Sequence, residues 1–190
     1  MIETIFFDLV GVLLIPRENY EANRLVDEID RLVGTVTNDA AFKEQTLSQF
    51  NLLENEFKDI LQSIVNKYEP YAPLWNLLPK IRKTYKLGII NNGTFLTFPL
   101  FDERYQISQR FDLFVSSALE GMCKPDRAIY LRACEKLGSQ PHNCLFMDDS
   151  EENILGAQRV GMQTIHWSER INGFQEFKDY VHTFDNIETD

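Results

Sequence analysis

The chain has 190 residues, which is enough for one well-packed core or for one domain that carries a smaller insert. Its formal charge of -10 argues against nucleic acid or an anionic membrane as the main partner, because both reward clustered Lys and Arg. The composition is globular at 44% hydrophobic residues, and no apolar run approaches the roughly 20 residues of a membrane span. No basic segment precedes the first apolar run, so we expect no signal peptide and a cytoplasmic location. An odd number of cysteines without zinc spacing predicts reduced thiols at Cys123, Cys134 and Cys144.

The first element is an apolar run over residues 5–14, IFFDLVGVLL, which is interrupted by Asp8 and Gly11. Such a run predicts a buried strand, and a carboxylate at its end is costly unless a metal, a phosphate or hydrogen bonds partner it. A glycine just past a strand allows a tight turn and lets backbone amides approach a small anion. Asp8 therefore stands where an open α/β sheet would hold a nucleophile.

Residues 16–70 are predicted to form an all-helical block. Apolar side chains recur at helical spacing over residues 22–33 and again over residues 38–68, and neither stretch has a strand signal. Pro70 and Pro73 end the block. We therefore expect a helical insert between the first and second strands.

Beyond the insert, strands alternate with helices to the end of the chain. The pattern predicts helices over residues 74–81, 126–137 and 151–160, strands over 86–90, 111–116, 144–147 and 163–167, and weak helical character over 174–181. Alternation of this kind implies a parallel sheet with right-handed crossovers. The predicted fold class is therefore α/β, with a parallel sheet core flanked by helices.

Polar side chains follow three of the predicted strands: Asp8, Asn91, Asn92, Asp148 and Asp149. Ligands bind beyond the carboxyl ends of the strands in such sheets, so these five side chains should meet in one crevice. Each has an ordinary explanation by itself, since Asn-Asn-Gly favours a turn and Asp-Asp-Ser favours a helix start. Several polar clusters at strand ends, in this order, are improbable as turns alone.

Four segments together resemble the haloacid dehalogenase (HAD) superfamily of aspartate-nucleophile hydrolases: FFDLVGVLL, LGIINNG, GMCKPDRAIY and NCLFMDDSEENILGAQRVGMQTI. The third and fourth segments are specific, because order, spacing and predicted strand context agree. The resemblance covers nearly the whole chain and implies a Rossmann-like core of residues 1–15 and 71–190. It also implies that residues 16–70 form the small helical cap of the branch whose cap follows the first motif.

The resemblance implies a Mg²⁺-dependent phosphatase of a small phosphorylated metabolite. Asp8 would attack phosphorus and form an aspartyl-phosphate, which splits one difficult displacement into two steps. Asp8 and Asp149, with Asp148 directly or through water and the backbone carbonyl of Val10, would hold the Mg²⁺ ion. The metal would neutralise phosphate charge.

The phosphate itself would be bound by the remaining motif residues. Lys124, which Pro125 keeps out of a helical conformation, would reach the phosphate and the nucleophile as a compact positive charge. Asn91, Asn92 and the amides that follow, including that of Gly93, would donate hydrogen bonds to phosphoryl oxygens.

Two positions depart from the family pattern. Val10 stands where the family's phosphatases usually have a second aspartate, and valine cannot transfer a proton. General acid–base catalysis is worth about 10² to 10⁴, whereas enzymes accelerate phosphate-monoester hydrolysis by up to about 10²¹, so this loss slows the reaction without abolishing it. Asn91 replaces the usual Ser or Thr, which should alter affinity. A similar bacterial branch acts on sugar phosphates, which suggests a sugar phosphate as substrate.

Two other functions stay open from the residues alone. A metal-independent 2-haloacid dehalogenase would also lack the second aspartate, but such enzymes typically have an aromatic residue there and lack the acidic pair, so the phosphatase is favoured. A catalytically weak member that binds a phospho-ligand or a protein partner is the third hypothesis, motivated by Val10 and Asn91. The sequence sets neither the substrate nor the replacement proton donor nor the oligomeric state.

Overall fold

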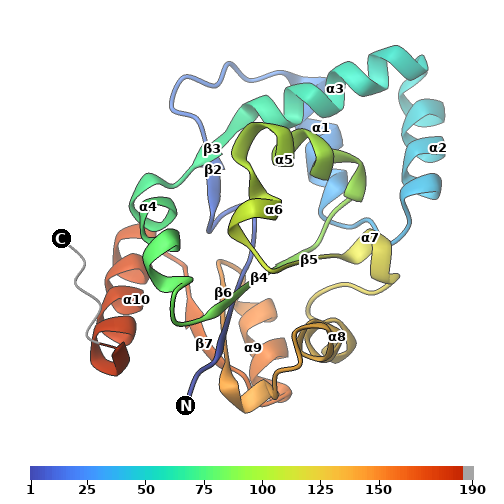
Figure 1. Ribbon diagram of the computed structural model, residues 1–190. Coiled ribbons are helices and arrows are strands. Elements are labelled where there is room, and N and C mark those ends of the chain that lie inside the picture. The colour runs from blue at the N-terminus through green and yellow to red at the C-terminus, as the bar shows by residue number, and fades with distance from the viewer. Residues whose placement is uncertain (186–190) are drawn as a thin grey trace.

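The computed structural model describes residues 1–185 and has a five-stranded sheet as its centre (Figure 1). Its strand order is β5-β4-β1-β6-β7, and every neighbouring pair is parallel. The strands are β1 (Thr4–Phe7), β4 (Lys86–Asn91), β5 (Leu113–Ser116), β6 (Cys144–Asp148) and β7 (Gln163–His166). The predicted parallel α/β sheet is confirmed. Because β1 is the middle strand, its carboxyl end lies between those of β4 and β6.

Helices cover both faces of the sheet because β1 is apolar on both sides. Phe6 packs with α8 (Arg127–Leu137) and α9 (Glu151–Arg159), whereas Ile5 and Phe7 face α4 (Ala72–Ile81) and α10 (Arg170–Asp185). Figure 1 shows the two helix layers on opposite sides of the strands. Full burial of β1 on both faces explains why its sequence is a continuous apolar run.

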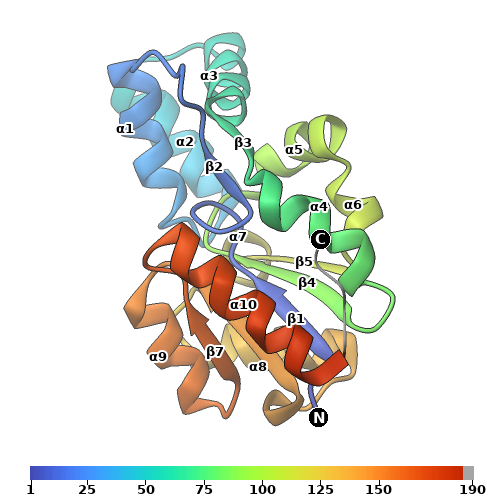
Figure 2. The same ribbon diagram turned by 90° about the vertical axis from the view of Figure 1, so that its left-hand side faces the viewer.

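Three helices of the insert lie beyond the carboxyl ends of the strands (Figure 2). They are α1 (Arg24–Val33), α2 (Asp39–Phe50) and α3 (Glu54–Lys67). The stretch over residues 38–68 is divided into two helices, because Asn51 ends α2 in the left-handed conformation at φ 52°. The Asn38 side chain caps α2 by accepting the N–H of Ala41 at 2.9 Å.

The insert is joined to the sheet domain by a two-stranded antiparallel ribbon. Strand β2 (Leu14–Pro16) pairs with β3 (Tyr68–Pro70), so the expectation of no strand at the end of the insert is wrong. Three residues are too few to show an alternating pattern, and the two strands are far apart in the sequence. Their pairing brings both connections of the insert together.

Several short elements were not predicted from the sequence. Residues 95–110 form η1 (Phe95–Thr97), α5 (Phe98–Tyr105) and α6 (Ile107–Arg110). Helix α7 (Ser117–Glu120) follows β5, and η2 (Pro141–Asn143) precedes β6. Helix α5 lies beside α3, where Arg104 donates to the side chain of Asn66 at 2.5 Å. The segment after β4 therefore helps to enclose the space above the strand ends.

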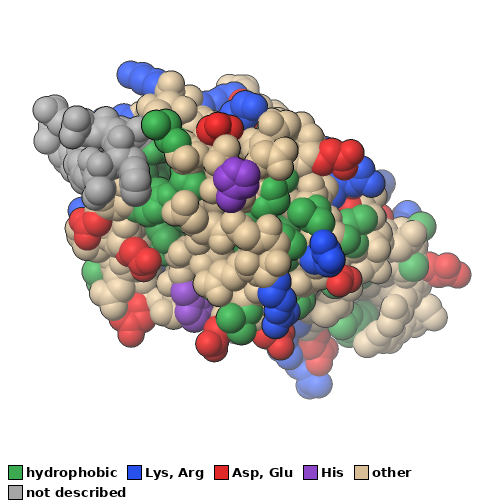
Figure 3. Space-filling view, turned by 90° about the horizontal axis from the view of Figure 1, so that it is seen from below, with side chains coloured by type: hydrophobic (Ala, Val, Ile, Leu, Met, Phe, Trp, Pro, Cys, Tyr) green, Lys and Arg blue, Asp and Glu red, His purple; other side chains and the backbone are tan. Residues whose placement is uncertain are grey.

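The face drawn in Figure 3 is mixed in charge, and the three cysteines form no disulfide. On the side seen in Figure 3, acidic and basic side chains are scattered among apolar ones. All three cysteines are free, as predicted, and the Sγ atoms of Cys134 and Cys144 lie 3.7 Å apart. Within residues 1–185, no helix has both the length and the apolar character to cross a bilayer.

Candidate active site

Asp8 directly follows the middle strand and contacts an ammonium group from a distant loop. Its backbone N–H donates to the carbonyl oxygen of Met147 on β6 at 2.8 Å, which fixes its position between the two strands. The Nζ of Lys124 donates to Oδ1 of Asp8 at 2.6 Å and to Oδ2 of Asp148 at 2.7 Å. These three side chains are buried, with exposed fractions of 7%, 3% and 0% for Asp8, Lys124 and Asp148. The structure therefore brings three predicted site residues into direct contact.

Asn92 holds the backbone of Lys124. The Lys124 N–H donates to Oδ1 of Asn92 at 2.8 Å, and Nδ2 of Asn92 donates to the Lys124 carbonyl oxygen at 2.9 Å. The peptide bond that follows, to Pro125, is cis. The Asn92 side chain is thus engaged with the lysine loop, and its predicted contact with a phosphoryl oxygen stays a prediction.

Asn91 and Gly93 differ in what they offer to a ligand. Asn91 is buried at the end of β4. A Cβ on Gly93 would lie 2.7 Å from Nδ2 of Asn91, so any larger residue at position 93 would displace the Asn91 side chain. The N–H of Gly93 donates to Oγ of Ser117 at 2.8 Å. The expected role of the Gly93 amide as a phosphate donor therefore competes with a hydrogen bond inside the protein.

Asp148 has every side-chain oxygen engaged. Its Oδ1 accepts the backbone N–H of Ser150 at 2.9 Å and Nδ2 of Asn153 at 3.0 Å, while Oδ2 accepts from Lys124. Asn153 was missed by sequence reasoning, because no motif points to a single asparagine in the first turns of a helix. These contacts suit Asp148 to orient the lysine.

Asp149 lies against the turn that follows the middle strand. A Cβ on Gly11 would be only 2.3 Å from Oδ2 of Asp149, and Gly11 adopts φ +106°, a conformation that side chains strongly disfavour. Glycine is required here both by its backbone and by the close carboxylate. Carboxylate oxygens of Asp8, Asp148 and Asp149 lie within 4.8 Å of one another.

The electrostatics of the cluster are dominated by burial and by surplus negative charge. Burial raises the pKa of Asp8 to about 7; Lys124 opposes this shift, and Asp148 and Asp149 reinforce it. Burial and Asp148 likewise raise the pKa of Asp149. For Lys124, burial would lower the pKa, but the adjacent Asp8 and Asp148 outweigh it and raise the pKa. The site has three carboxylates and one ammonium, so it carries surplus negative charge. Carboxylate oxygens are the ligands that a hard divalent cation such as Mg²⁺ prefers.

A cavity of about 290 Å³ opens above this cluster. Asp8, Asn91, Asn92 and Lys124 line it from the sheet side, and residues of α1, α3, β3 and α5 line it from the opposite side. The residues on the opposite side, such as Asp30 and Phe101, carry no motif, and only the packing of the insert on the sheet reveals them.

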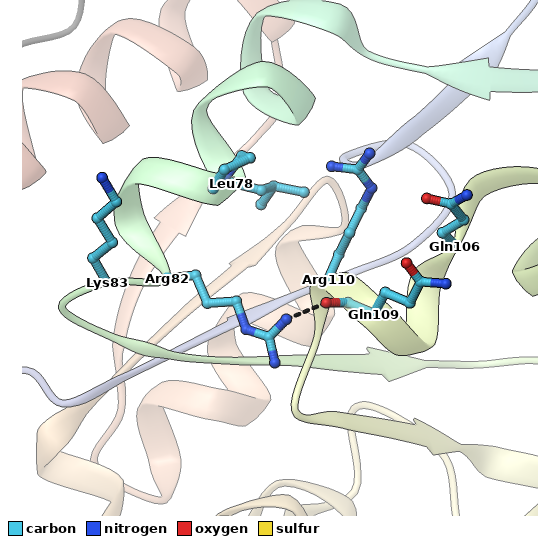
Figure 4. A pocket seen from close by; sticks show the side chains of 7 residues that line it. Leu78, Arg82, Lys83, Gln106, Gln109 and Arg110 are labelled. Atoms are coloured by element: carbon cyan, nitrogen blue, oxygen red, sulfur yellow. Dashed lines mark hydrogen bonds between the residues drawn. The ribbon is translucent and has the colours of Figure 1, made fainter.

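A second cavity, of about 550 Å³, shares no lining residue with the cavity above Asp8 among the residues that the structure describes (Figure 4). It lies between α4 and α6 and has cationic and amide side chains around it. Arg82 donates to the carbonyl oxygen of Gln109 and pairs with Asp112 at 2.7 Å, and the Arg110 guanidinium lies over the ring of Trp75 at 5.1 Å. Its arginines therefore tie α4, α6 and the start of β5 together.

The fold and the cluster define an α/β protein with an acidic, lysine-bridged site at the carboxyl ends of its central strands. Comparison with known proteins assigns the chain to a family. A family model described as haloacid dehalogenase-like hydrolase matches residues 15–167. The chain belongs to this hydrolase family.

Several relatives and solved structures are similar over most of their length. The sesquiterpene phosphatase astK of Aspergillus oryzae is 26% identical and aligns over 92% of this chain and 94% of its own. The pyrophosphatase PpaX of Bacillus mycoides is 24% identical over 95% of this chain and 92% of its own. A HAD family enzyme from Bacteroides thetaiotaomicron, solved with magnesium and inorganic phosphate, superposes with a TM-score of 0.70 at 19% identity, covering 87% of this chain and 94% of that one.

Proposed function

We propose that this hydrolase is a Mg²⁺-dependent phosphatase of a small phosphorylated metabolite and that Asp8 is its nucleophile. One observation carries the proposal. Lys124 bridges Asp8 and Asp148 in a buried site, and a carboxylate oxygen of Asp149 lies within 4.8 Å of oxygens of both aspartates, so the three could hold one metal ion. The phosphatase names of astK and PpaX support the same reaction class. A cytoplasmic location and a cap formed by residues 16–70 belong to the proposal.

The proposed reaction has two steps. The free carboxylate oxygen of Asp8 attacks phosphorus, the bond from phosphorus to the ester oxygen breaks, and the alcohol leaves with a proton from solvent. Water then attacks the aspartyl-phosphate, which releases inorganic phosphate and restores Asp8. Lys124 holds the nucleophile in place and offsets charge on the transferred group.

Asp8, Asp149 and the backbone carbonyl of Val10 would hold Mg²⁺, which neutralises phosphate charge and lets a carboxylate approach phosphorus. Asp148 contributes directly or through water, and its contacts with Lys124, Ser150 and Asn153 favour an orienting role. Asn91, Asn92 and Gly93 complete the proposed phosphate subsite.

The test uses acetyl phosphate, because its leaving group departs without a proton and so tolerates valine at position 10. We expect phosphate release that requires Mg²⁺, stops with chelator and is lost in Asp8→Asn and Lys124→Met. Absence of turnover both for acetyl phosphate and for phosphate esters, or full activity of Asp8→Asn, would reject the proposal. Chloride release from 2-chloropropionate in the presence of chelator would instead identify a dehalogenase.

A further inference from the structure

The cavity above Asp8 is polar on one side and apolar on the other. Its sheet side carries the charged and amide groups of the proposed phosphate subsite. The opposite side is formed mainly by apolar side chains: Val33 of α1, Ile64 of α3, Tyr68 of β3 and Phe101 of α5. If a phosphoryl group binds at Asp8 as proposed, a leaving group held in this cavity lies against the apolar wall.

The wall is closely packed onto the phosphate subsite. A Cβ on Gly93 would be 3.3 Å from Cγ1 of Val33, so the end of α1 closes against the loop that follows Asn91 and Asn92. Ile64 on α3 and Phe101 on α5 are buried, with exposed fractions of 2% and 4%. A hydroxyl-rich leaving group would lose hydrogen bonds to water here without regaining them, which is costly.

The two hydroxyl groups on this side, those of Thr97 and Tyr68, already donate inside the protein. Oγ1 of Thr97 donates to the carbonyl oxygen of Thr94 at 3.3 Å, and the Tyr68 hydroxyl donates to Oδ2 of Asp30 at 2.6 Å. Neither hydroxyl therefore has a donor hydrogen left for a polyol. The wall is therefore suited to carbon rather than to hydroxyl groups.

The charge at the edge of the wall is negative. Asp30 and Asp27 share a single ammonium, that of Lys67, which lies 2.8 Å from a carboxylate oxygen of each. Two carboxylates against one ammonium leave the group with a net charge of about -1 at neutral pH. A leaving group with its own phosphate or carboxylate would be repelled, because the described residues that line the cavity offer no cation except Lys124, which is held at the nucleophile.

We propose that this site selects phosphate monoesters of small, uncharged, apolar alcohols over polyol phosphates and over substrates with a second anionic group. This inference rests on the proposed phosphatase function and narrows its substrate class. It disfavours the sugar phosphate that the sequence resemblance suggests. It also separates this chain from an enzyme that cleaves pyrophosphate, whose leaving group is an anion.

The first test compares three monoesters: isopentyl phosphate, glycerol 1-phosphate and phosphoglycerate with its phosphate on the terminal hydroxyl. The first two leaving groups have equal numbers of non-hydrogen atoms, so they differ in polarity and not in size. We expect kcat/KM for isopentyl phosphate to exceed that for glycerol 1-phosphate by about tenfold or more, the range that apolar contacts reach in hydrophobic pockets. We expect phosphoglycerate to be the poorest of the three. Preference for either polar substrate would overturn the inference.

Binding tests the same order without turnover. The non-hydrolysable phosphonate analogues of the three substrates are titrated against the Mg²⁺-loaded protein by calorimetry, and the alkyl phosphonate should bind most tightly. Absence of acetyl phosphate turnover together with this binding order would reject the proposed function and keep only the preference of the cavity for an apolar group in binding. Turnover of acetyl phosphate with tighter binding of the glycerol analogue would reject the inference and keep the proposed function.

Two variants locate the selectivity in the wall. Relative to acetyl phosphate, Val33→Asp should lower kcat/KM for isopentyl phosphate and Asp30→Asn should raise kcat/KM for phosphoglycerate, each by about tenfold, the scale of one such contact. Thr35→Asp is the matched control, because Thr35 is exposed, lies two residues from Val33 and does not line the cavity. Equal effects of Val33→Asp and Thr35→Asp would contradict the inference.

Discussion

The carboxamide of Asn92 accepts the backbone N–H of Lys124 at 2.8 Å and donates to the carbonyl oxygen of the same residue at 2.9 Å. This double hydrogen bond fastens the loop before α8 to the end of β4. The position of the Lys124 ammonium between two carboxylates follows from it. Asn92 therefore acts as a positioning residue, whatever else it contacts.

Replacing Asn92 tests this arrangement. Asn92→Ala should lower kcat/KM for acetyl phosphate by about 10²-fold, the cost of misplacing a catalytic group by roughly 1 Å. Asn92→Asp keeps the acceptor for the Lys124 N–H but loses the donor to the Lys124 carbonyl oxygen. Its activity should therefore fall between those of the wild type and of Asn92→Ala. Steady-state kinetics measures both variants. Wild-type activity in Asn92→Ala would show that other contacts place the lysine.

Gly11→Ala tests the link between the turn and Asp149. The new Cβ would be 2.3 Å from Oδ2 of Asp149, so the carboxylate must move, and calorimetry should show weaker Mg²⁺ binding. The backbone at φ +106° adds strain of about 1–3 kcal/mol to the cost of folding.

Gly121→Ala is the matched control for that substitution. Gly121 also has a positive φ, +67°, but within the described part of the chain a Cβ there meets no atom within 4 Å. It should lose stability while keeping its Mg²⁺ affinity. Equal Mg²⁺ affinity in both alanine variants would contradict a metal role for Asp149.

Val10→Asp should restore the proton donor that the chain lacks. Val10 lines the cavity beside Asp8, so a carboxyl group there can reach a departing alcohol. Turnover of an alkyl phosphate should rise by about 10² or more, the usual contribution of general acid–base catalysis. Hydrolysis of acetyl phosphate should gain much less, because acetate leaves without a proton.

Val10→Asn is the control, since it has nearly the same shape as the aspartate and no proton to transfer. A rate on alkyl phosphates that is unchanged in Val10→Asp would indicate a different proton donor or a binding role for the protein. A similar gain in Val10→Asn would assign the effect to polarity alone.

Tyr68→Phe tests the anchoring of the insert. The Tyr68 hydroxyl is buried and donates to Oδ2 of Asp30 at 2.6 Å, and hydrogen bonds to charged groups contribute about 1.5–3 kcal/mol. The free energy of unfolding in urea should fall by a similar amount. Burial and Asp30 raise the pKa of Tyr68, so the hydroxyl stays a donor and the loss should be the same at neutral and mildly alkaline pH.

Tyr71→Phe gives the comparison, because the Tyr71 ring packs edge-on against Trp167 and phenylalanine keeps that contact. Its effect on stability should be the smaller of the two. An unchanged free energy of unfolding in Tyr68→Phe would show that Lys67 alone satisfies Asp30.

The sequence by itself determined the sheet and the residues at its carboxyl edge. A continuous apolar run marks a strand buried on both faces, and alternation of strands with helices forces parallel pairing, so Asp8, Asn91 and Asp148 had to meet at one edge. These inferences need only local periodicity and the rules of crossover connections. The same reasoning brought Asp149 to that edge without any knowledge of side-chain contacts.

The tertiary structure alone decided what each of those residues contacts. The pairing of β2 with β3, the helices of residues 95–110 and the partner of Asn92 depend on segments that are distant in the chain. The apolar wall is built from α1, α3, β3 and α5, and no local pattern encodes which of their faces meet. Periodicity reports which side of an element is buried, whereas the packing of elements against one another decides what it is buried against.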